Sequence, residues 1–145
     1  MGSATRLPLL AAALWWGSLT ALFWIVPLLF AHLPSPALAG GAAARLFSAQ
    51  TWATLGCCML ILVASRPRDA DRTAAWARSV LPWVLGGLLL ALLVEFAVAP
   101  RIVARENLKL WHNLGSGMLL LQWVCAATTL WQLARPAPHP EQEGD

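Results

Sequence analysis

Charged residues are scarce in this sequence, and their absence from long runs excludes an ordinary soluble domain. Only 12% of the residues are charged, and residues 7–44 contain no Asp, Glu, Lys or Arg. A water-exposed surface needs charged side chains throughout, whereas a membrane span needs roughly 20 uncharged helical residues. With 59% hydrophobic residues, the chain has the composition of an integral membrane protein.

Tyrosine is absent, cysteine is rare, and no catalytic or cofactor motif is present. The three cysteines, Cys57, Cys58 and Cys125, fall inside apolar runs, where thiols act as small apolar residues rather than as a disulfide framework. Membrane spans and their loops use almost all of the 145 residues, so no separate domain remains for familiar enzyme chemistry. We therefore expect no enzyme activity, no cofactor and no nucleic-acid partner.

A bound metal ion is the alternative to a protein without a cofactor, but the candidate ligands give it little support. Cys57, Cys58 and Met59 are soft donors of the kind that select copper(I), and His32 with His112 could bind haem. Adjacent residues on a helix point about 100° apart, so Cys57 and Cys58 cannot both face one site without distortion. We expect no metal site.

Four apolar segments are long enough to cross a bilayer as helices. They lie near residues 7–33, 46–65, 79–99 and 114–134, and about 20 helical residues cross the hydrocarbon core. Residues 1–135 are thus expected to form one all-α, four-span domain, followed by a disordered polar tail at 136–145. A secretory signal ending near Ala39 is the alternative for the first segment, but signal peptides have apolar stretches of only about 7–15 residues.

The distribution of basic residues favours an orientation with both termini in the cytoplasm. The side of the membrane that holds the termini carries more Lys and Arg than the other side, and such an excess is typical of the cytoplasmic side. The basic residues expected on the side of the termini are Arg6, Arg66, Arg68, Arg72, Arg78 and Arg135. Those expected on the opposite side are Arg45, Arg101, Arg105 and Lys109. We expect a multi-pass protein of a bacterial inner membrane, anchored at headgroup level by Trp15, Trp76, Trp83, Trp111 and Trp131.

Two segments near the ends of the first and third spans are alike. Residues 23–31 and 96–104 share the pattern Phe-x3-Pro-x3-Ala, and Gln50 and Gln122 follow at similar distances. The pattern suggests two repeated helical hairpins, and chance matching in an apolar chain is the alternative. Because proline lacks an N–H and disfavours helix before it, we expect each helix to kink or end at Pro27 and Pro100.

The connections that follow these prolines are long enough to lie along the membrane surface. They are His32–Arg45 in the first half and Arg101–Lys109 in the second. In the second connection, chargeable residues recur every four positions with apolar residues between them, which is typical of an amphipathic helix. We expect short interfacial helices on the face opposite the termini.

The polar residues that suit a functional site gather on that same face. Glu95 lies about one helical turn inside the predicted boundary, where an ionisable group is costly unless it reaches water or a partner. It is a candidate proton or cation site, with His112 as ligand or proton relay. The alternative is that Glu95 pairs with Arg101 or Arg105 and only fastens the surface segment. The substrate or ion candidates are Glu95, Arg101, Arg105, His112 and Asn113, with His32, Glu106 and Lys109 on the same side.

Small residues recur every four positions within the spans, a pattern typical of close helix contacts. The first span carries Ala13, Gly17 and Ala21, the second carries Ala49, Ala53 and Cys57, the third carries Gly87 and Ala91, and Gly115 begins the fourth. Such stripes build either a compact bundle or a face for a second membrane protein.

Four short motifs are spread over most of the chain. They are Trp16-Gly17-Ser18, the sequence VPLLF at 26–30, Ala39-Gly40 leading to Leu46-Phe47, and the sequence WHNLGS at 111–116. On these motifs the chain resembles the TMEM205-like, DUF4149 family of small four-helix membrane proteins. The resemblance implies an integral membrane protein without an established biochemical activity in bacterial members, whereas the animal relatives are linked to platinum-drug resistance and vesicle traffic.

The function that these observations favour is not enzymatic. We expect a membrane protein that moves or senses a small solute or ion, with Glu95 and His112 together in a water-accessible cleft. The alternative is a structural or assembly subunit, whose small-residue stripes would face lipid and await a homo-oligomeric or other membrane partner.

Overall fold

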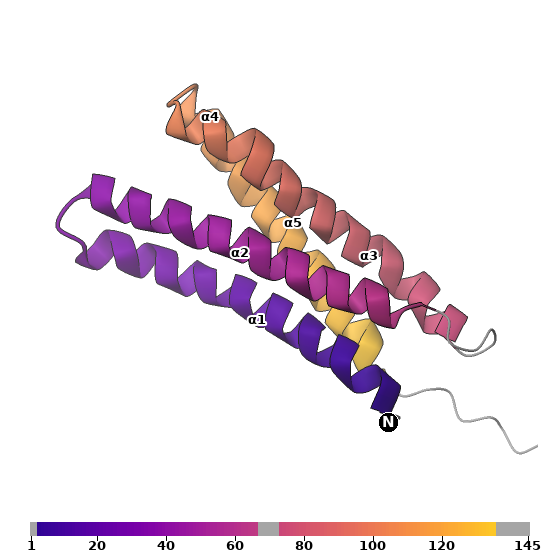
Figure 1. Ribbon diagram of the computed structural model, residues 1–145. Coiled ribbons are helices and arrows are strands. Elements are labelled where there is room, and N and C mark those ends of the chain that lie inside the picture. The colour runs from indigo at the N-terminus through magenta and orange to yellow at the C-terminus, as the bar shows by residue number, and fades with distance from the viewer. Residues whose placement is uncertain (1–2, 67–72, 136–145) are drawn as a thin grey trace, which may run out of the picture.

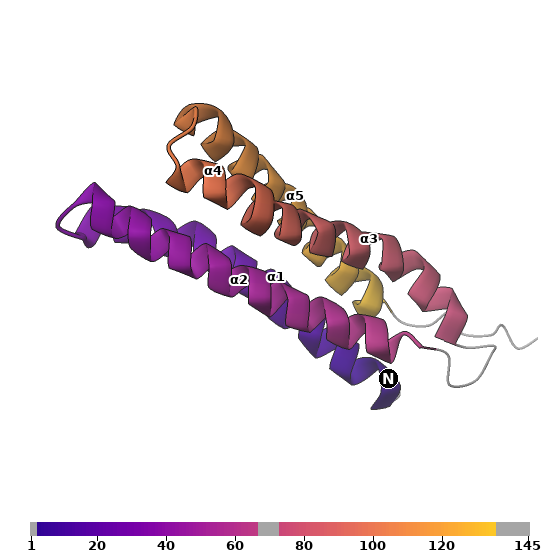
Figure 2. The same ribbon diagram turned by 45° about the horizontal axis from the view of Figure 1, so that its top comes forward.

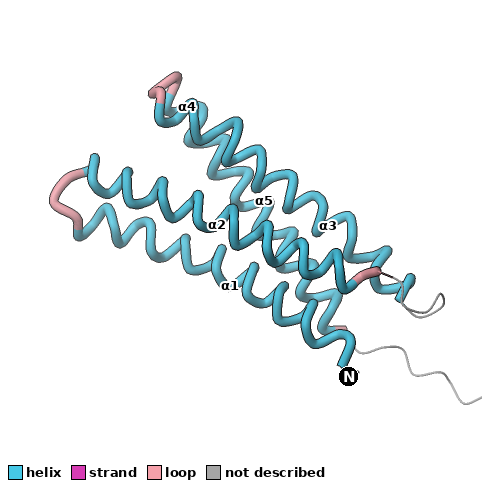
Figure 3. Tube along the Cα trace, in the orientation of Figure 1, coloured by secondary structure: helices cyan, strands magenta, loops and turns pink. Residues whose placement is uncertain are grey.

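The computed structural model describes residues 3–66 and 73–135, with side chains from residue 6 onward in the first range and from residue 77 onward in the second. The predicted polar tail at 136–145 and the loop residues Arg68 and Arg72 lie outside the described residues, as does the side chain of Trp76. The described part consists of helices joined by short connections (Figures 1 and 3). These are α1 (Ser3–His32), α2 (Pro36–Ala64), α3 (Thr73–Leu93), the π-helical segment η1 (Val94–Val98), α4 (Ala99–Val103) and α5 (Leu108–Ala134).

Four of these stretches are long and apolar enough to span a membrane. They are Arg6–His32, Pro36–Ala64, Ala77–Val103 and Leu108–Ala134, each of 27–29 residues. At 1.5 Å per residue such helices measure roughly 40 Å, which covers the hydrocarbon core and reaches the headgroups on both sides. In lipid a backbone must satisfy its own hydrogen bonds, so long apolar runs fold as helices. The prediction of four spans is confirmed, and the chain is a multi-pass membrane protein.

The first connection is much shorter than the sequence suggested. Only residues 33–35 separate α1 from α2, and α2 begins at Pro36 rather than near Leu46. The reason is a strong local start signal: the Ser35 hydroxyl accepts a hydrogen bond from the Leu38 N–H at 3.3 Å, and Pro36 occupies the first helical position. At the other side of this connection, α1 does not end at Pro27 but continues to His32.

The surface helix expected over Arg101–Lys109 is also absent from the described chain. Residues 99–103 complete the third span, residues 104–107 form a turn, and α5 begins at Leu108. In the turn the Glu106 N–H bonds to the Arg101 carbonyl at 3.1 Å, and Arg105 adopts a left-handed backbone with φ 57°. These are the bonds and backbone of a Schellman ending, which closes a helix within one turn and leaves no length for a separate segment.

The four spans pair as two hairpins. One hairpin is α1 with α2, the other is α3, η1 and α4 with α5, and further contacts join α1 to α5 and α2 to α3. Figures 1 and 2 show that the hairpins lie close together near the start of α1 and the end of α5, and diverge towards residues 33–35 and 104–107. We call the first the terminal end of the bundle and the second the turn end.

The core is centred on Trp15, which is completely buried. A Cβ atom at Gly87 would lie 2.4 Å from carbons of the Trp15 six-membered ring, so this ring reaches from α1 to the backbone of α3. Cys57, Cys58 and Cys125 pack in the same cluster as small apolar side chains. The expectation that Trp15 anchors the chain at headgroup level is therefore wrong, because the indole fills the space between the helices instead.

Candidate functional site

The π-helical segment η1 directly precedes Pro100. Proline has no N–H to donate and its ring clashes with the carbonyl four residues earlier, and in this span the preceding turn widens to relieve the clash. The Ala99 N–H accordingly bonds to the carbonyl of Val94, five residues back. The carbonyl of Glu95 loses both regular donors, because Ala99 is used elsewhere and Pro100 has none. Glu95 thus lies in a widened, π-helical turn. Such turns within α-helices are often found at functional sites.

The Glu95 carboxylate joins the two hairpins. Its Oε1 accepts a hydrogen bond from the Ser48 hydroxyl on α2, and the bond is partly buried. In the described chain no ion pair neutralises it, and the expected pair with Arg101 or Arg105 does not form. Arg101 instead donates from Nη1 to the Ala97 carbonyl at 2.7 Å and lies over the Trp111 ring.

Uncharged polar side chains form a layer at the middle of the spans, on the terminal-end side of Glu95. Gln50 of α2 donates to Ser18 Oγ of α1 at 3.0 Å and to Thr54 Oγ1 at 3.3 Å. Gln122 of α5 donates to the Gly87 carbonyl of α3 at 3.2 Å. Each glutamine is buried and bonds to the first helix of its own hairpin. The two residues that marked the sequence repeat therefore have equivalent roles in the two hairpins.

A further bond in this layer crosses between the hairpins. The Trp123 indole of α5 donates to Thr20 Oγ1 of α1 at 2.9 Å, and the Thr20 hydroxyl donates to the Trp16 carbonyl at 2.8 Å. Sequence reasoning singled out neither Thr20 nor Ser48. The available signal was that uncharged polar residues in membrane spans are often bonded to neighbouring helices.

The histidines and Asn113 do not join Glu95 in the structure. His112 and Asn113 are exposed in the first turns of α5, and no hydrogen bond or ion pair links His112 to Glu95. His32 ends α1, where its Nδ1 donates to the Leu28 carbonyl at 3.0 Å, so it satisfies a helix-terminal carbonyl. Arg105, Glu106 and Lys109 are exposed in and beside the turn.

The small-residue stripes have two different orientations. Gly87 and Ala91 are buried inside the bundle, and a Cβ at Gly115 would lie 3.2 Å from Val98 Cγ1. Ala13 and Gly17 are exposed, Ala21 is half-buried, and no atom of another helix lies within 4 Å of a Cβ placed at Gly17. The third and fourth spans thus use small residues for contacts within the chain, whereas the first span presents them outward.

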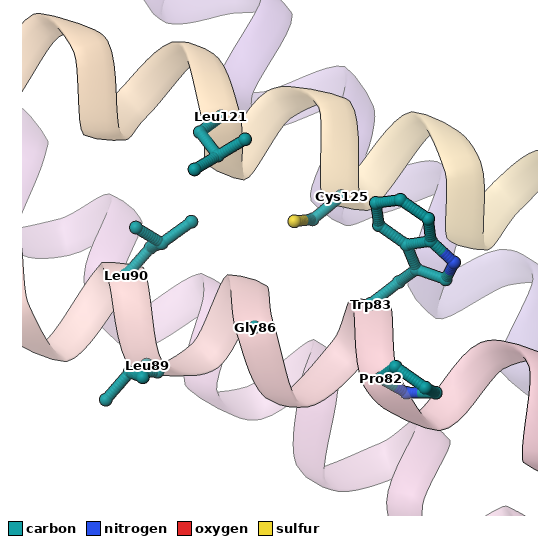
Figure 4. A pocket seen from close by; sticks show the side chains of 7 residues that line it. All are labelled: Pro82, Trp83, Gly86, Leu89, Leu90, Leu121 and Cys125. Carbon is teal, nitrogen blue, oxygen red and sulfur yellow. The ribbon is translucent and has the colours of Figure 1, made fainter.

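Two open grooves lie on the surface of the spans. One, of about 370 Å³, runs between α3 and α5, and in Figure 4 the Cys125 sulfur points into it from α5, beside Gly86 and Trp83. The other, of about 350 Å³, lies between α1 and α5 at Phe23, Trp24 and Trp123. No charged side chain lines either groove. Among the described residues, no group of three or more His, Cys, Asp or Glu side chains could hold a metal ion, and Cys58 Sγ contacts the Val84 carbonyl at 3.8 Å.

The model of one protein family matches most of these elements. It is the family described as "Domain of unknown function (DUF4149)", and the match covers residues 10–110, from α1 to the start of α5. The chain belongs to the DUF4149 family. No curated protein and no solved structure matches the chain. The matched region of this DUF4149 protein includes Glu95, Ser48 and the π-helical segment.

Proposed function

We propose that this DUF4149 protein moves or senses a small ion, and that Glu95 binds it without enzymatic chemistry. The supporting observation is a carboxylate inside a membrane span that bonds to the opposite hairpin and has no cationic partner among the described residues. An ionisable group within the membrane is costly and is characteristically associated with proton or ion pathways. A proton or a monovalent cation would neutralise Glu95. The favoured ion is the proton, because it needs a single carboxylate oxygen, whereas a metal cation needs several ligands and Ser48 is the one described side chain bonded to Glu95.

The surrounding groups support this assignment. The widened turn leaves the Glu95 carbonyl without a regular helical donor, and irregular backbone of this kind within a membrane is typical of transporter ion sites. Ser18, Gln50 and Thr54 form a second group of hydroxyl and amide side chains, which lies nearer the middle of the bundle than Glu95. Such groups can exchange hydrogen bonds with a moving ion or water.

The test is proton flux into vesicles that contain the purified protein. Vesicles are loaded with a pH-sensitive dye, and the membrane potential is clamped while an external pH step is applied. Wild-type protein should raise the flux above that of protein-free vesicles, and Glu95→Gln should reduce the added flux about 100-fold or more, the usual effect of removing a positioned proton-transfer group. Glu106→Gln is the matched control, because it removes an exposed carboxylate in the turn and should leave the flux unchanged.

Two results would overturn the transport proposal. One is a wild-type flux equal to that of empty vesicles for protons, sodium and potassium alike. The other is an equal loss in Glu95→Gln and Glu106→Gln, since the effect would then not depend on the carboxylate inside the span. A melting curve of each variant in detergent separates loss of function from loss of fold.

A second candidate function is assembly with another membrane protein, and the outward stripe of α1 favours it. Ala13 and Gly17 face away from the bundle, as expected of a face that awaits a partner helix. Gly17→Leu would block close approach at this face and should release any oligomer or partner seen by cross-linking in membranes. An unchanged cross-linking pattern in Gly17→Leu would remove this candidate.

We also propose the orientation of the chain in the membrane and its relationship to one group of proteins. The excess of Arg on the side of the termini supports cytoplasmic termini in a bacterial inner membrane. The motifs Trp16-Gly17-Ser18 and WHNLGS at 111–116 support a relationship with the TMEM205-like proteins.

A further inference from the structure

The turn between α4 and α5 gathers positive charge that the protein itself does not neutralise. Arg101, Arg105 and Lys109 lie within this short stretch, and Glu106 is the one acidic residue among them. No ion pair involving Glu106 forms within the described chain. The other connection at the turn end, residues 33–35, is Leu-Pro-Ser and carries no charge. Of the two connections at the turn end, only the one in the second hairpin therefore carries excess positive charge.

Arg101 is held in place by two contacts. Its Nη1 donates to the Ala97 carbonyl at 2.7 Å, and its guanidinium carbon lies 4.5 Å from the centre of the Trp111 ring. A guanidinium has five N–H donors in a rigid plane, so one bond to Ala97 leaves most of them available. The side chain is exposed, and these remaining donors can reach an anion without a large loss of side-chain entropy.

Apolar side chains border the same charges. Val103 is 75% exposed, Leu108 is 49% exposed and Leu110 is 55% exposed. These residues lie at the ends of two membrane spans, beside a tryptophan, where headgroups meet acyl chains. A free anion would use only the basic groups, whereas a phospholipid would cover the basic and the apolar groups together.

We infer that this turn binds the headgroup phosphate of an anionic phospholipid, with Arg101 as the oriented donor, Arg105 and Lys109 as supporting charges, and Val103, Leu108 and Leu110 against its acyl chains. A positive residue near an anionic membrane surface contributes about 1 kcal/mol, or about a five-fold change in binding for each charge. The bound lipid would hold the end of the second hairpin at headgroup level. The inference does not depend on the ion-binding role of Glu95.

Native mass spectrometry of the full chain in detergent tests this site. The probes are phosphatidylglycerol and phosphatidylcholine of equal chain length, added at equal concentration. Wild-type protein should retain phosphatidylglycerol in preference, Arg101→Gln should weaken this binding about five-fold, and Arg101→Gln with Arg105→Gln about 25-fold. Arg45→Gln is the matched control, because Arg45 is an exposed arginine of the first hairpin, within α2 rather than in a turn, with no bonded partner in the described chain.

Three outcomes would overturn the inference. The first is equal retention of the two lipids by wild-type protein. The second is a loss in Arg45→Gln as large as that in Arg101→Gln, which would indicate attraction to net charge rather than a site. The third is displacement of phosphatidylglycerol by millimolar inorganic phosphate, which would identify a site for a free anion instead of a lipid. Melting curves of all variants show whether a loss reflects unfolding.

Discussion

Trp15 and Gly87 fit together so closely that each constrains the identity of the other. The Trp15 ring is completely buried and occupies the space where a side chain at residue 87 would begin. Interiors packed to this density tolerate added volume poorly, because neighbouring side chains leave their preferred rotamers to accept it. The glycine is therefore required for contact across the bundle, rather than for backbone freedom.

Gly87→Ala should destabilise the protein by about 1–3 kcal/mol, the usual cost of overpacking a core. The matched control is Gly17→Ala, which adds the same methyl group where no other helix lies within 4 Å. Because alanine forms helices more readily than glycine, the control should be neutral or slightly stabilising. Thermal unfolding in detergent measures both variants, and an equal loss of stability in the two would contradict the packing described here.

For single residues, the sequence predicts a role correctly where the residue type is rare in membrane spans, and misses it where the type is common there. Glu95 stood out because charge inside a span is unusual. Its partner Ser48 did not, since serine in a membrane helix commonly bonds to its own backbone, as Ser65 does to the Ile61 carbonyl at 2.7 Å. Trp15 was misplaced because tryptophan prefers headgroup level on average, and only the missing side chain at Gly87 makes room for it in the core.

At the scale of elements, the third span shows how one proline can shape a site. The sequence predicts that Pro100 disturbs the helix, but several local rearrangements relieve the same clash. In this chain α1 continues through Pro27 to His32, whereas the third span forms a π-helical segment before Pro100. The difference depends on tertiary contacts such as that between Ser48 and Glu95, which no local pattern contains.

Pro100→Ala should stabilise the third span and weaken the contact between Glu95 and Ser48. The new N–H supplies the missing hydrogen-bond donor and so removes part of the destabilisation that proline causes inside a helix, about 3 kcal/mol. The π-helical turn can then narrow, and Glu95 rotates away from α2. A double-mutant cycle of Ser48→Ala and Glu95→Gln measures the contact, and the coupling should fall from about 1 kcal/mol to near zero. Pro27→Ala makes the same chemical change in α1 and should leave that coupling intact. Unchanged coupling in Pro100→Ala would contradict the link between the π-helical segment and the site.

For the whole molecule, span number follows from the sequence because uncharged length is a direct requirement of the bilayer. The pairing of the spans into hairpins follows from their short connections. The divergence of the hairpins at the turn end (Figure 2) depends on side-chain volumes across all four helices, so the sequence does not predict it. The prediction of surface segments is wrong for a related reason. The apolar runs in the sequence mark the hydrocarbon core, whereas the helices continue beyond its boundary.

With four spans and the termini at one end of the bundle, residues 33–35 and 104–107 must share the opposite side of the membrane. Leu33→Cys and Glu106→Cys place thiols at the turn end, and Arg135→Cys places one at the terminal end. If the termini are cytoplasmic, a membrane-impermeant maleimide added to intact cells should label the first two variants and not the third. Wild-type protein is the background control, because Cys57, Cys58 and Cys125 are buried. If Arg135→Cys alone is labelled, the orientation is the opposite one, and the turn end, near which Glu95 lies, faces the cytoplasm.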